Sequence, residues 1–394
     1  MLRIDGLPGA TAEDDAPGQG TQEPAARHPG TPKGTGTSKD PGTLAKAAPG
    51  QAAQDQGTPG FGTLGGSGPT AARARRAGPL PSRGATAAIG NFDGVHRGHA
   101  ALVAAARAAR ADAPLAVVTF EPHPREVFQP DAAPFRLTTD AERARQIEAL
   151  GVDVLAVLPF DAALSSMSPA CFARDVLAGH DTGGLGLSHV TVGSDFRFGR
   201  GRAGNAALLR DLGRALGFGV EVLDLVGDEA GEYSSTAARA AIRSGRMEDA
   251  ATILGRWHAV TGSVVKGDQR GRELGYPTAN LDFGAQVIPR YGVYAAEVAV
   301  LAGPHAGTYP GVASIGERPT FGINAPNFEV HLFDFQGDLY GTPITARLVR
   351  FLRDELAFDG VEALIAQMDR DSAEAREALA RAEIAASRAL GGAA

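Results

Sequence analysis

Apolar and polar residues follow two different patterns along the chain, and the change between them divides it. From about residue 85 to 245, short apolar runs that fit buried strands alternate with longer stretches of helical spacing. Such alternation predicts a Rossmann-like α/β domain, with a parallel sheet and helices on both faces. The expected strands are Thr86–Ile89, Leu115–Phe120, Val152–Leu158, His189–Val192 and Val220–Val226; the expected helices are Ala100–Arg110, Asp140–Leu150, Ser168–Leu177 and Asn205–Leu216.

Short β-rich runs separated by turn residues begin near residue 250 and predict a small antiparallel β-barrel over 250–394. A terminal helix is expected from Val361 to about Ser387, with Leu364, Ile365 and Met368 against the barrel. The predicted class is therefore α/β plus β. The expected barrel strands are His258–Val265, Val293–Val300, Gly311–Ile315, Phe328–Phe335 and Ile344–Leu352.

Residues 1–84 differ from both patterns, since one third of them are glycine or proline. Such a segment cannot bury enough apolar surface to offset the entropy lost on ordering, so we expect all of residues 1–84 to be disordered. Three interpretations remain open: linker-like disorder, an organelle transit peptide and translation from an upstream start. Acidic residues at Glu13, Asp14 and Asp15 disfavour the transit peptide.

Charge and composition exclude several classes of protein. The 394 residues carry a formal net charge of −7, whereas a nucleic-acid-binding protein should present a basic face. No apolar run approaches the ~18 residues that span a bilayer. The single cysteine, Cys171, allows no disulfide within the chain and fits a reducing compartment. We expect a cytoplasmic protein with small-molecule substrates and no nucleic-acid or membrane partner, either a monomer or a weak homo-oligomer.

The most informative stretch runs from Ala88 to His99, Ala-Ile-Gly-Asn-Phe-Asp-Gly-Val-His-Arg-Gly-His. A strand, a glycine turn and a helix N-terminus place free backbone N–H groups and a positive dipole end at one spot. His96 and His99 lie three residues apart, on one face of the first helical turn. Imidazole donors there stabilise the charge that develops on phosphate oxygens. A glycine-rich turn with incidental histidines, or half of a metal site, are the alternatives.

Other loops leave the carboxyl ends of predicted strands, where ligands bind in such sheets. They are Phe120–Pro124 and Gly193–Gly199. The run Ser234-Ser-Thr-Ala-Ala-Arg239 can cap a helix or bind a phosphate, with Arg243 as a second candidate cation. By itself this run favours an ordinary helix cap.

Gly199-Arg-Gly-Arg-Ala-Gly204 matches the dinucleotide-binding pattern G-x-G-x-x-G, and Asp224 follows in the next expected strand. An NAD-dependent oxidoreductase is therefore an alternative function. Its weakness is spacing, because the first glycine should follow the strand directly. Here Gly193–Gly199 intervenes.

The second strong stretch is Gly267-Asp-Gln-Arg-Gly-Arg-Glu-Leu-Gly-Tyr-Pro-Thr-Ala-Asn280. Its glycines allow the backbone to approach a phosphate closely. Thr278 and Asn280 face the same way in an extended chain, and such oxygen ligands suit Mg²⁺ bound with ATP phosphates. In Asn327–Leu332, Glu329 and His331 share one strand face, where a carboxylate could act as a general base.

These motifs together resemble bacterial bifunctional riboflavin kinase/FAD synthetases. The run Gly90–His99 is similar to the family's long HxGH motif, 192–204 to its VGxDFRFGxxRxG element and Ser234–Arg239 to its SSTxxR element. The run 267–280 resembles the one that ends in PTAN. Two positions depart from the pattern: Asn205, where an acid is usual, and Ala238, where a branched aliphatic residue is usual.

The resemblance implies that 85–245 is an FMN adenylyltransferase domain and that 250–394 is a riboflavin kinase domain. The chain would convert riboflavin to FMN and FMN to FAD, with ATP as co-substrate and Mg²⁺ as cofactor. A flavin-binding protein without turnover remains a further alternative, although such a protein needs no base. The implied catalytic residues are His96, His99, Arg239 and Glu329, and the implied metal ligands are Thr278 and Asn280. The implied nucleotide-binding residues are Gly90, Asn91, Phe92, Asp93, Gly94, Gly98, Ser235, Thr236, Gly267, Gly271, Arg272, Gly275 and Pro277. The implied flavin-binding residues are Pro122, His123, Asp195, Phe196 and Arg353.

Overall fold

The computed structural model describes residues 1–6, 82–179, 183–229, 231–267, 271, 274–317 and 326–391. The part up to residue 254 holds the first module and two further helices. Its elements are β1 (Leu2–Asp5), β2 (Thr86–Ile89), α1 (Arg97–Ala109), β3 (Leu115–Glu121), α2 (Pro124–Phe128), α3 (Asp140–Ala149), β4 (Val154–Pro159), α4 (Ala162–Ser166), α5 (Pro169–Cys171), the π-helix η1 (Phe172–Ala178), β5 (His189–Gly193), β6 (Arg197–Phe198), the 3-10 helix η2 (Arg200–Arg202), β7 (Gly204–Asn205), α6 (Ala206–Leu216), β8 (Gly219–Leu223), β9 (Gly227–Asp228), β10 (Gly231–Glu232), α7 (Ser235–Arg243) and α8 (Met247–Leu254).

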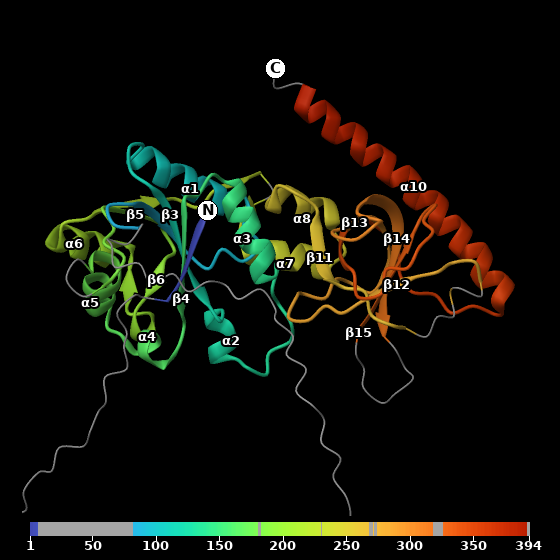
Figure 1. Cartoon of the computed structure of the whole chain (residues 1–394), viewed down its shortest axis with the longest axis horizontal. Helices are drawn as coiled ribbons and strands as arrows, with labels where there is room; N and C mark the ends of the chain where they lie inside the picture. The colour runs from blue at the N-terminus through green and yellow to red at the C-terminus, as the bar shows by residue number, and fades with distance from the viewer. Residues whose placement is uncertain are drawn as a thin grey trace, which may run out of the picture. The chain divides into compact units, whose positions relative to one another are not determined.

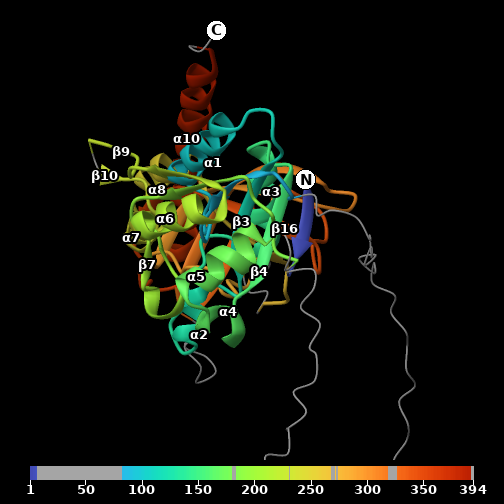
Figure 2. The same cartoon turned by 90° about the vertical axis from the view of Figure 1, so that its left-hand side faces the viewer.

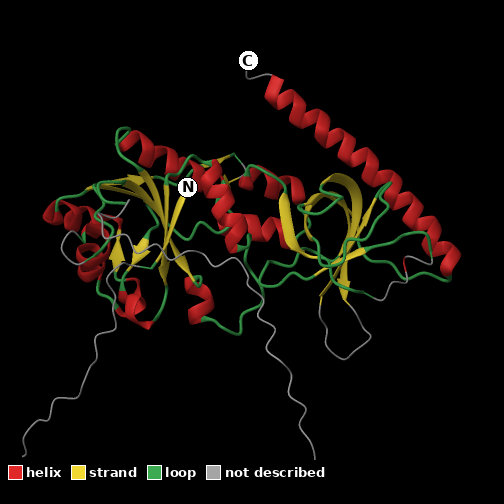
Figure 3. Ribbon diagram, in the orientation of Figure 1, coloured by secondary structure: helices red, strands yellow, loops and turns green. Residues whose placement is uncertain are grey.

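Six parallel strands form one sheet in the order β1-β4-β3-β2-β5-β8. Alternate side chains enter two separate cores, one on each face. Ala88, Val117 and Leu155 pack with α1 and α3, whereas Ile89 and Val118 pack with η1 and α6. Figure 3 shows the helices on both sides of this sheet. The predicted parallel sheet covered on both faces is confirmed.

Local sequence signals located the helix starts well. The side chains of Thr139, Ser168 and Asn205 accept the capping hydrogen bonds of α3, α5 and α6, as helix N-caps of this type do. The expected strand Val220–Val226 ends earlier, at Leu223, since the chain then enters the short hairpin of β9 and β10.

The expectation that all of residues 1–84 are disordered is wrong for the two ends of this segment, because residues 1–6 and 82–84 are part of the fold and Ser82 is fully buried. Leu2–Asp5 forms β1, an edge strand that pairs in parallel with β4. Figure 2 shows this blue strand at the edge of the sheet. Ile4 packs against one of the two cores. Four residues are enough for an edge strand, but their alternation was hidden by the Gly- and Pro-rich composition that follows.

The second module is a curled antiparallel sheet with the order β11-β16-β13-β14-β15-β12. An isolated bridge between Val265, just after β11, and Asn280 of β12 joins its two edges. The barrel prediction is therefore confirmed, although the sequence patterns did not show β12. Its elements are β11 (His258–Ser263), β12 (Ala279–Leu281), β13 (Gly292–Val300), β14 (Gly307–Glu317), β15 (Pro326–Leu332), β16 (Pro343–Arg353) and α10 (Val361–Gly391).

Helix α10 packs against β13, β14 and β16, and Figure 1 shows it along this sheet. The residues that enter the shared core are Ala375, Ala378 and Leu379. They lie about two to four turns beyond Leu364 and Met368, which are only partly buried.

A single apolar core joins the barrel to α7 and α8. It contains Ala238 and Ile242 of α7 and Leu254 of α8, together with barrel residues such as Tyr294 and Phe328. Ala238, the residue that departs from the family pattern, is fully buried there. The two domain boundaries at 245 and 250 remain predictions.

Candidate active sites

The two histidines of the first motif cap helix α1 reciprocally. The backbone N–H of His99 donates to Nδ1 of His96, and the N–H of His96 donates to Nδ1 of His99, both at 3.3 Å. Their rings stack with centroids 3.6 Å apart, and Phe92 stacks on His99. Because each Nδ1 accepts a hydrogen bond, a neutral ring carries its proton on Nε2. The arrangement therefore provides two Nε2–H donors at a helix N-terminus.

Glycine is required at two positions of this turn. A Cβ at Gly98 would lie 2.7 Å from the carbonyl oxygen of Tyr233 and 3.1 Å from the His96 ring. Gly94 has a φ of +83°, and its Cβ would lie 2.6 Å from Leu137. The motif's glycines thus allow close packing around the histidines.

Burial keeps both histidines neutral near pH 7. Burial, together with the neighbouring charges of Arg239 and Arg256, lowers the pKa of His96 to about 4. The pKa of His99 lies well below its usual range because of burial, His96 and Arg256. Each ring therefore donates through Nε2–H as a neutral imidazole, while its Nδ1 accepts a backbone N–H.

Two arginines surround the turn. Arg239 pairs with the buried Asp93 at 2.5 Å and donates to the carbonyl of Phe135 at 2.8 Å. Arg256 donates to the carbonyls of Val95 and Gly94 at 3.1 and 2.5 Å, and burial lowers its pKa to about 10. It stays charged at pH 7. Sequence reasoning missed Arg256, because it lies beyond α8 and outside every motif.

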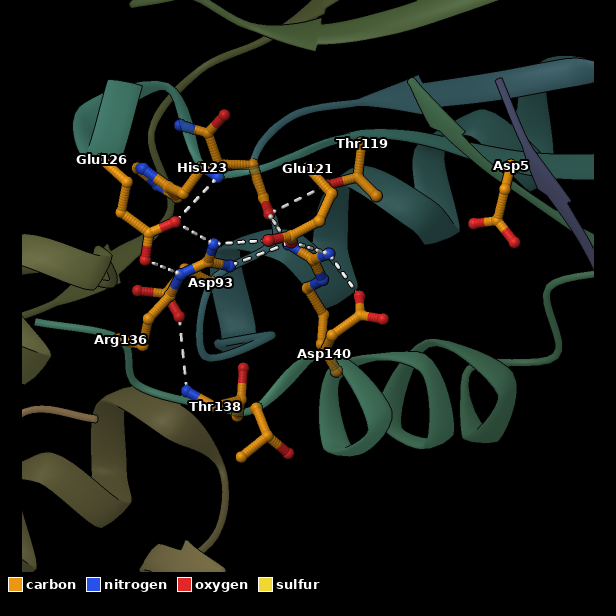
Figure 4. Close-up of polar contacts among 12 residues, drawn as sticks. Asp5, Asp93, Thr119, Glu121, His123, Glu126, Arg136, Thr138 and Asp140 are labelled. Atoms are coloured by element: carbon orange, nitrogen blue, oxygen red, sulfur yellow. Dashed lines mark hydrogen bonds and ion pairs between the residues drawn. The ribbon is translucent and has the colours of Figure 1, made fainter. Parts of the chain in front are cut away.

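The loop Glu121–Arg125 contains the predicted flavin ligands Pro122 and His123 and is named the flavin loop for that prediction; it leaves β3 beside this turn. Thr119 donates from Oγ1 to the carbonyl of Asn91 at 3.0 Å, which ties the two loops together (Figure 4). His123 caps α2 by accepting from the N–H of Arg125 at 3.0 Å, and burial lowers its pKa to about 4. Pro122 precedes it. The sheet thus brings Gly90–His99 and the flavin loop to one edge, as predicted.

The other predicted ligand-binding residues of the first module are exposed or contact other protein groups. Ser235 donates from Oγ to the carbonyl of Asp93 at 2.8 Å, while Thr236 is exposed and Ser234 is the helix cap. Asp195 is exposed, and Phe196 stacks on Phe198 at 5.5 Å.

The geometry disagrees with a dinucleotide-binding turn at Gly199–Gly204. Residues 194–196 and strand β6 separate this loop from β5. The loop itself contains the 3-10 helix η2, and its last residue begins β7, which pairs with β6. A Cβ at Gly204 would lie 2.6 Å from the ring of Phe198, so this glycine serves internal packing.

In the barrel, three motif residues meet across β12 and β15. Thr278 donates from Oγ1 to Glu329 Oε2 at 3.2 Å, and Asn280 pairs with Glu329 in the strand register. Asn327, which sequence reasoning did not select, donates to Glu329 Oε1 at 2.8 Å. A hydroxyl, an amide and a carboxylate therefore converge on one sheet face.

A cavity of about 300 Å³ adjoins this cluster, and Thr278, Ala279, Phe335, Leu339 and Tyr340 line it. Such a volume is near the lower end for small-ligand sites.

The glycines of the second motif pack mainly against protein atoms. A Cβ at Gly267 would lie 2.5 Å from the Asn280 amide, and one at Gly271 would lie 2.3 Å from the carbonyl of Tyr276. Gly275 has a φ of +84°. His331 Nδ1 donates to the carbonyl of Pro277 at 2.8 Å, which anchors the loop to β15. Arg272 lies outside the described residues.

Arg353, a predicted flavin ligand, is bound to α10. Its guanidinium donates to both carboxylate oxygens of the buried Asp371, at 2.8 and 2.6 Å. This bidentate pair joins β16 to the helix, so a flavin contact by Arg353 remains a prediction.

Buried neutral histidines should make the protein sensitive to acid. The pKa of His258 is lowered to about 4 by burial and Arg256, and its Nε2 has no partner among the described residues. An unfolded histidine titrates near 6.5, so this residue's contribution is complete above pH 6.5 and is lost as pH falls toward 4. We expect the free energy of unfolding to be about 2 kcal/mol lower at pH 5 than at pH 7 because of His258.

The measurement is denaturant unfolding at pH 7 and pH 5 for wild type and His258→Phe. The variant should lose about 2 kcal/mol less between the two pH values. Equal losses in both proteins would contradict the prediction.

Comparisons with known proteins agree with both modules. A family model described as FAD synthetase matches residues 80–237, and one described as riboflavin kinase matches residues 254–379. The bifunctional riboflavin kinase/FMN adenylyltransferase of Escherichia coli (strain K12) is 40% identical over 299 residues, covering 75% of this chain and 93% of that protein. The protein of the same name from Bacillus subtilis (strain 168) is 35% identical and covers 73% and 90%.

A crystal structure of a Streptococcus pneumoniae protein named macrolide-efflux protein is also similar. It has a TM-score of 0.65 and 31% sequence identity, and it covers 73% of this chain and 92% of that one. Among the helices that the structure describes here, none is both long and apolar enough to cross a membrane.

Proposed function

The chain belongs to the family of bifunctional riboflavin kinase/FMN adenylyltransferases, and from this premise we propose which residues carry out each reaction. It phosphorylates riboflavin to FMN and transfers an adenylyl group from ATP to FMN, giving FAD. We assign adenylyl transfer to the site around His96 and His99, and phosphorylation to the site around Thr278 and Glu329. The observation that carries the first assignment is the reciprocal capping of the two histidines.

In adenylyl transfer, a phosphate oxygen of FMN attacks the α-phosphorus of ATP and pyrophosphate leaves. Negative charge grows on the oxygen between the α- and β-phosphorus atoms, because its bond to the α-phosphorus breaks. The Nε2–H groups of His96 and His99 would stabilise this charge, together with the N-terminal end of α1. Arg239 and Arg256 would add positive charge, and the flavin loop with Pro122 and His123 would hold FMN.

In phosphorylation, the carboxylate of Glu329 would accept the proton of the ribityl hydroxyl as that oxygen attacks the γ-phosphorus. Thr278 and Asn280 would hold Mg²⁺. The donor set fits this ion, because hard oxygen donors lie beside a carboxylate and the site leaves room for water and phosphate ligands. When bound, Mg²⁺ neutralises charge on the ATP phosphates. A cytoplasmic location and the monomeric or weakly associated state remain predictions from the sequence.

The direct test is chromatography of the full-length chain incubated with riboflavin, ATP and Mg²⁺. We expect FMN to appear first and FAD to follow. The full chain is preferable to one that begins at residue 85, because β1 belongs to the sheet. Absence of both products would refute the proposal, and FMN alone would refute the assignment of the histidine site.

The metal assignment predicts a specific defect in Thr278→Ala. Loss of one oxygen ligand should raise the Mg²⁺ concentration for half-maximal phosphorylation by roughly tenfold, within the range seen when groups around a metal are altered. Thr278→Ser keeps the oxygen and should restore the wild-type requirement. An unchanged Mg²⁺ requirement in Thr278→Ala would place the metal elsewhere. Adenylylation of added FMN is the internal control.

A further inference from the structure

The edge strand β1 is connected to the flavin loop by a row of charged side chains. Arg3 donates from Nη1 to Asp140 Oδ2 at 2.7 Å, and Asp140 Oδ1 accepts from Arg143 Nη2 at 2.6 Å. The same nitrogen of Arg143 donates to Glu121 Oε2 at 2.7 Å. Arg3 therefore reaches the end of β3 through three consecutive ion pairs.

The row continues into the flavin loop, as Figure 4 shows for its part from Asp140 onward. Arg136 donates to Glu121 Oε1 at 2.7 Å and to Glu126 Oε2 at 2.5 Å. Glu126 in turn accepts the backbone N–H of His123 at 3.2 Å. Positive and negative groups alternate along the whole row, so each holds the orientation of the next.

Burial makes these contacts interdependent. The side chains of Arg143 and Arg136 are only 2% and 8% exposed, and Nε of Arg143 has no partner among the described residues. A buried guanidinium is costly unless its partners are well placed. Asp140 is held between Arg3 and Arg143: burial would raise its pKa, but hydrogen bonds from both arginines lower it below its usual range.

We propose that Arg3 and Asp140 are positioning residues for FMN, which act through Arg143 on Glu121 and thereby on Pro122 and His123. Docking of β1 fixes the carboxylate of Asp140, and this orients Arg143 against Glu121 at the base of the flavin loop. Without Arg3, the row holds one more negative than positive charge. The inference rests on the proposed function, in which this loop holds the flavin. It gives the first residues of the chain a role in adenylyl transfer, although residues 7–81 separate them from the motif.

The test is steady-state kinetics of full-length Arg3→Ala. We expect the KM for FMN in adenylyl transfer to rise by about fivefold, as for mutations along coupled networks. The KM for ATP and the rate of riboflavin phosphorylation should stay within about twofold of wild type. Arg3→Lys should restore most of the affinity for FMN. Arg214→Ala, which removes an exposed ion pair with Asp211 on α6, is the matched control and should change nothing.

A second variant separates positioning from a general loss of stability. In a Glu121→Gln background, Arg3→Ala should not raise the KM for FMN further, because both substitutions interrupt one pathway. Independent effects in the double variant, an unchanged KM in Arg3→Ala, or equal losses of both activities would overturn the inference.

Failure of the proposed function gives a different result. In that case wild type forms no FAD, or His123→Ala leaves the KM for FMN unchanged. If His123→Ala raises this KM and Arg3→Ala does not, only the positioning role is refuted.

Discussion

Replacing His99 with asparagine is expected to lower the rate of FAD formation from FMN by about 10³-fold and to leave riboflavin phosphorylation unchanged. The loss follows because one preorganised donor to the developing phosphate charge disappears, and such donors contribute about 10²–10³ each. Asparagine is preferable to alanine, since its Oδ1 can accept the N–H of His96 in place of Nδ1. Alanine would leave that N–H unpaired, at a cost of about 1–3 kcal/mol in stability.

The measurement is single-turnover conversion of added FMN, with riboflavin phosphorylation by the same preparation as the control for folding. His99→Gln provides the complementary variant, because its amide can imitate the Nε2–H donor but not the cap. It should retain more adenylyl transfer than His99→Asn while being less stable. Wild-type FAD formation in His99→Asn would show that the histidine pair is structural.

Local features of the sequence predicted most of the fold. The caps at Thr139, Ser168 and Asn205 and the apolar runs of the parallel strands depend on neighbouring residues, so they are visible in the sequence. The two motifs, 88–99 and 267–280, were also visible in the sequence, because each is a continuous stretch of residues. Helix α1 and the antiparallel pairing of β12 with β15 complete them.

Features that depend on distant residues were not predictable. Arg256 reaches the first motif from 161 residues away, without any local pattern around it. Strand β1 has only four residues, and the composition that follows it suggested disorder. The ion pair of Arg353 with Asp371 could not be predicted either, because Asp371 lies on a helix whose register against the barrel was not visible in the sequence. In each case the deciding contact is a tertiary one.

Replacing Glu329 with glutamine is expected to lower riboflavin phosphorylation by about 10²–10⁴-fold, the usual contribution of a general base. The amide keeps the size of the side chain. Its oxygen can still accept from Asn327, and its NH2 group can donate to the hydroxyl of Thr278, so the barrel should remain folded. It cannot take up the proton of the ribityl hydroxyl.

The readout for Glu329→Gln is FMN formation from riboflavin, measured beside FAD formation from added FMN, which should be normal. Glu297→Gln is the matched control, because this glutamate lies on strand β13 of the same barrel and pairs with Arg347 at the surface. Only the Glu329 variant should lose phosphorylation. If both variants phosphorylate riboflavin normally, the base is another group. If both lose activity equally, the effect comes from the charge of the barrel. A kinase defect confined to Glu329→Gln, set against the opposite defect of His99→Asn, would assign the two reactions to two separate sites of one chain.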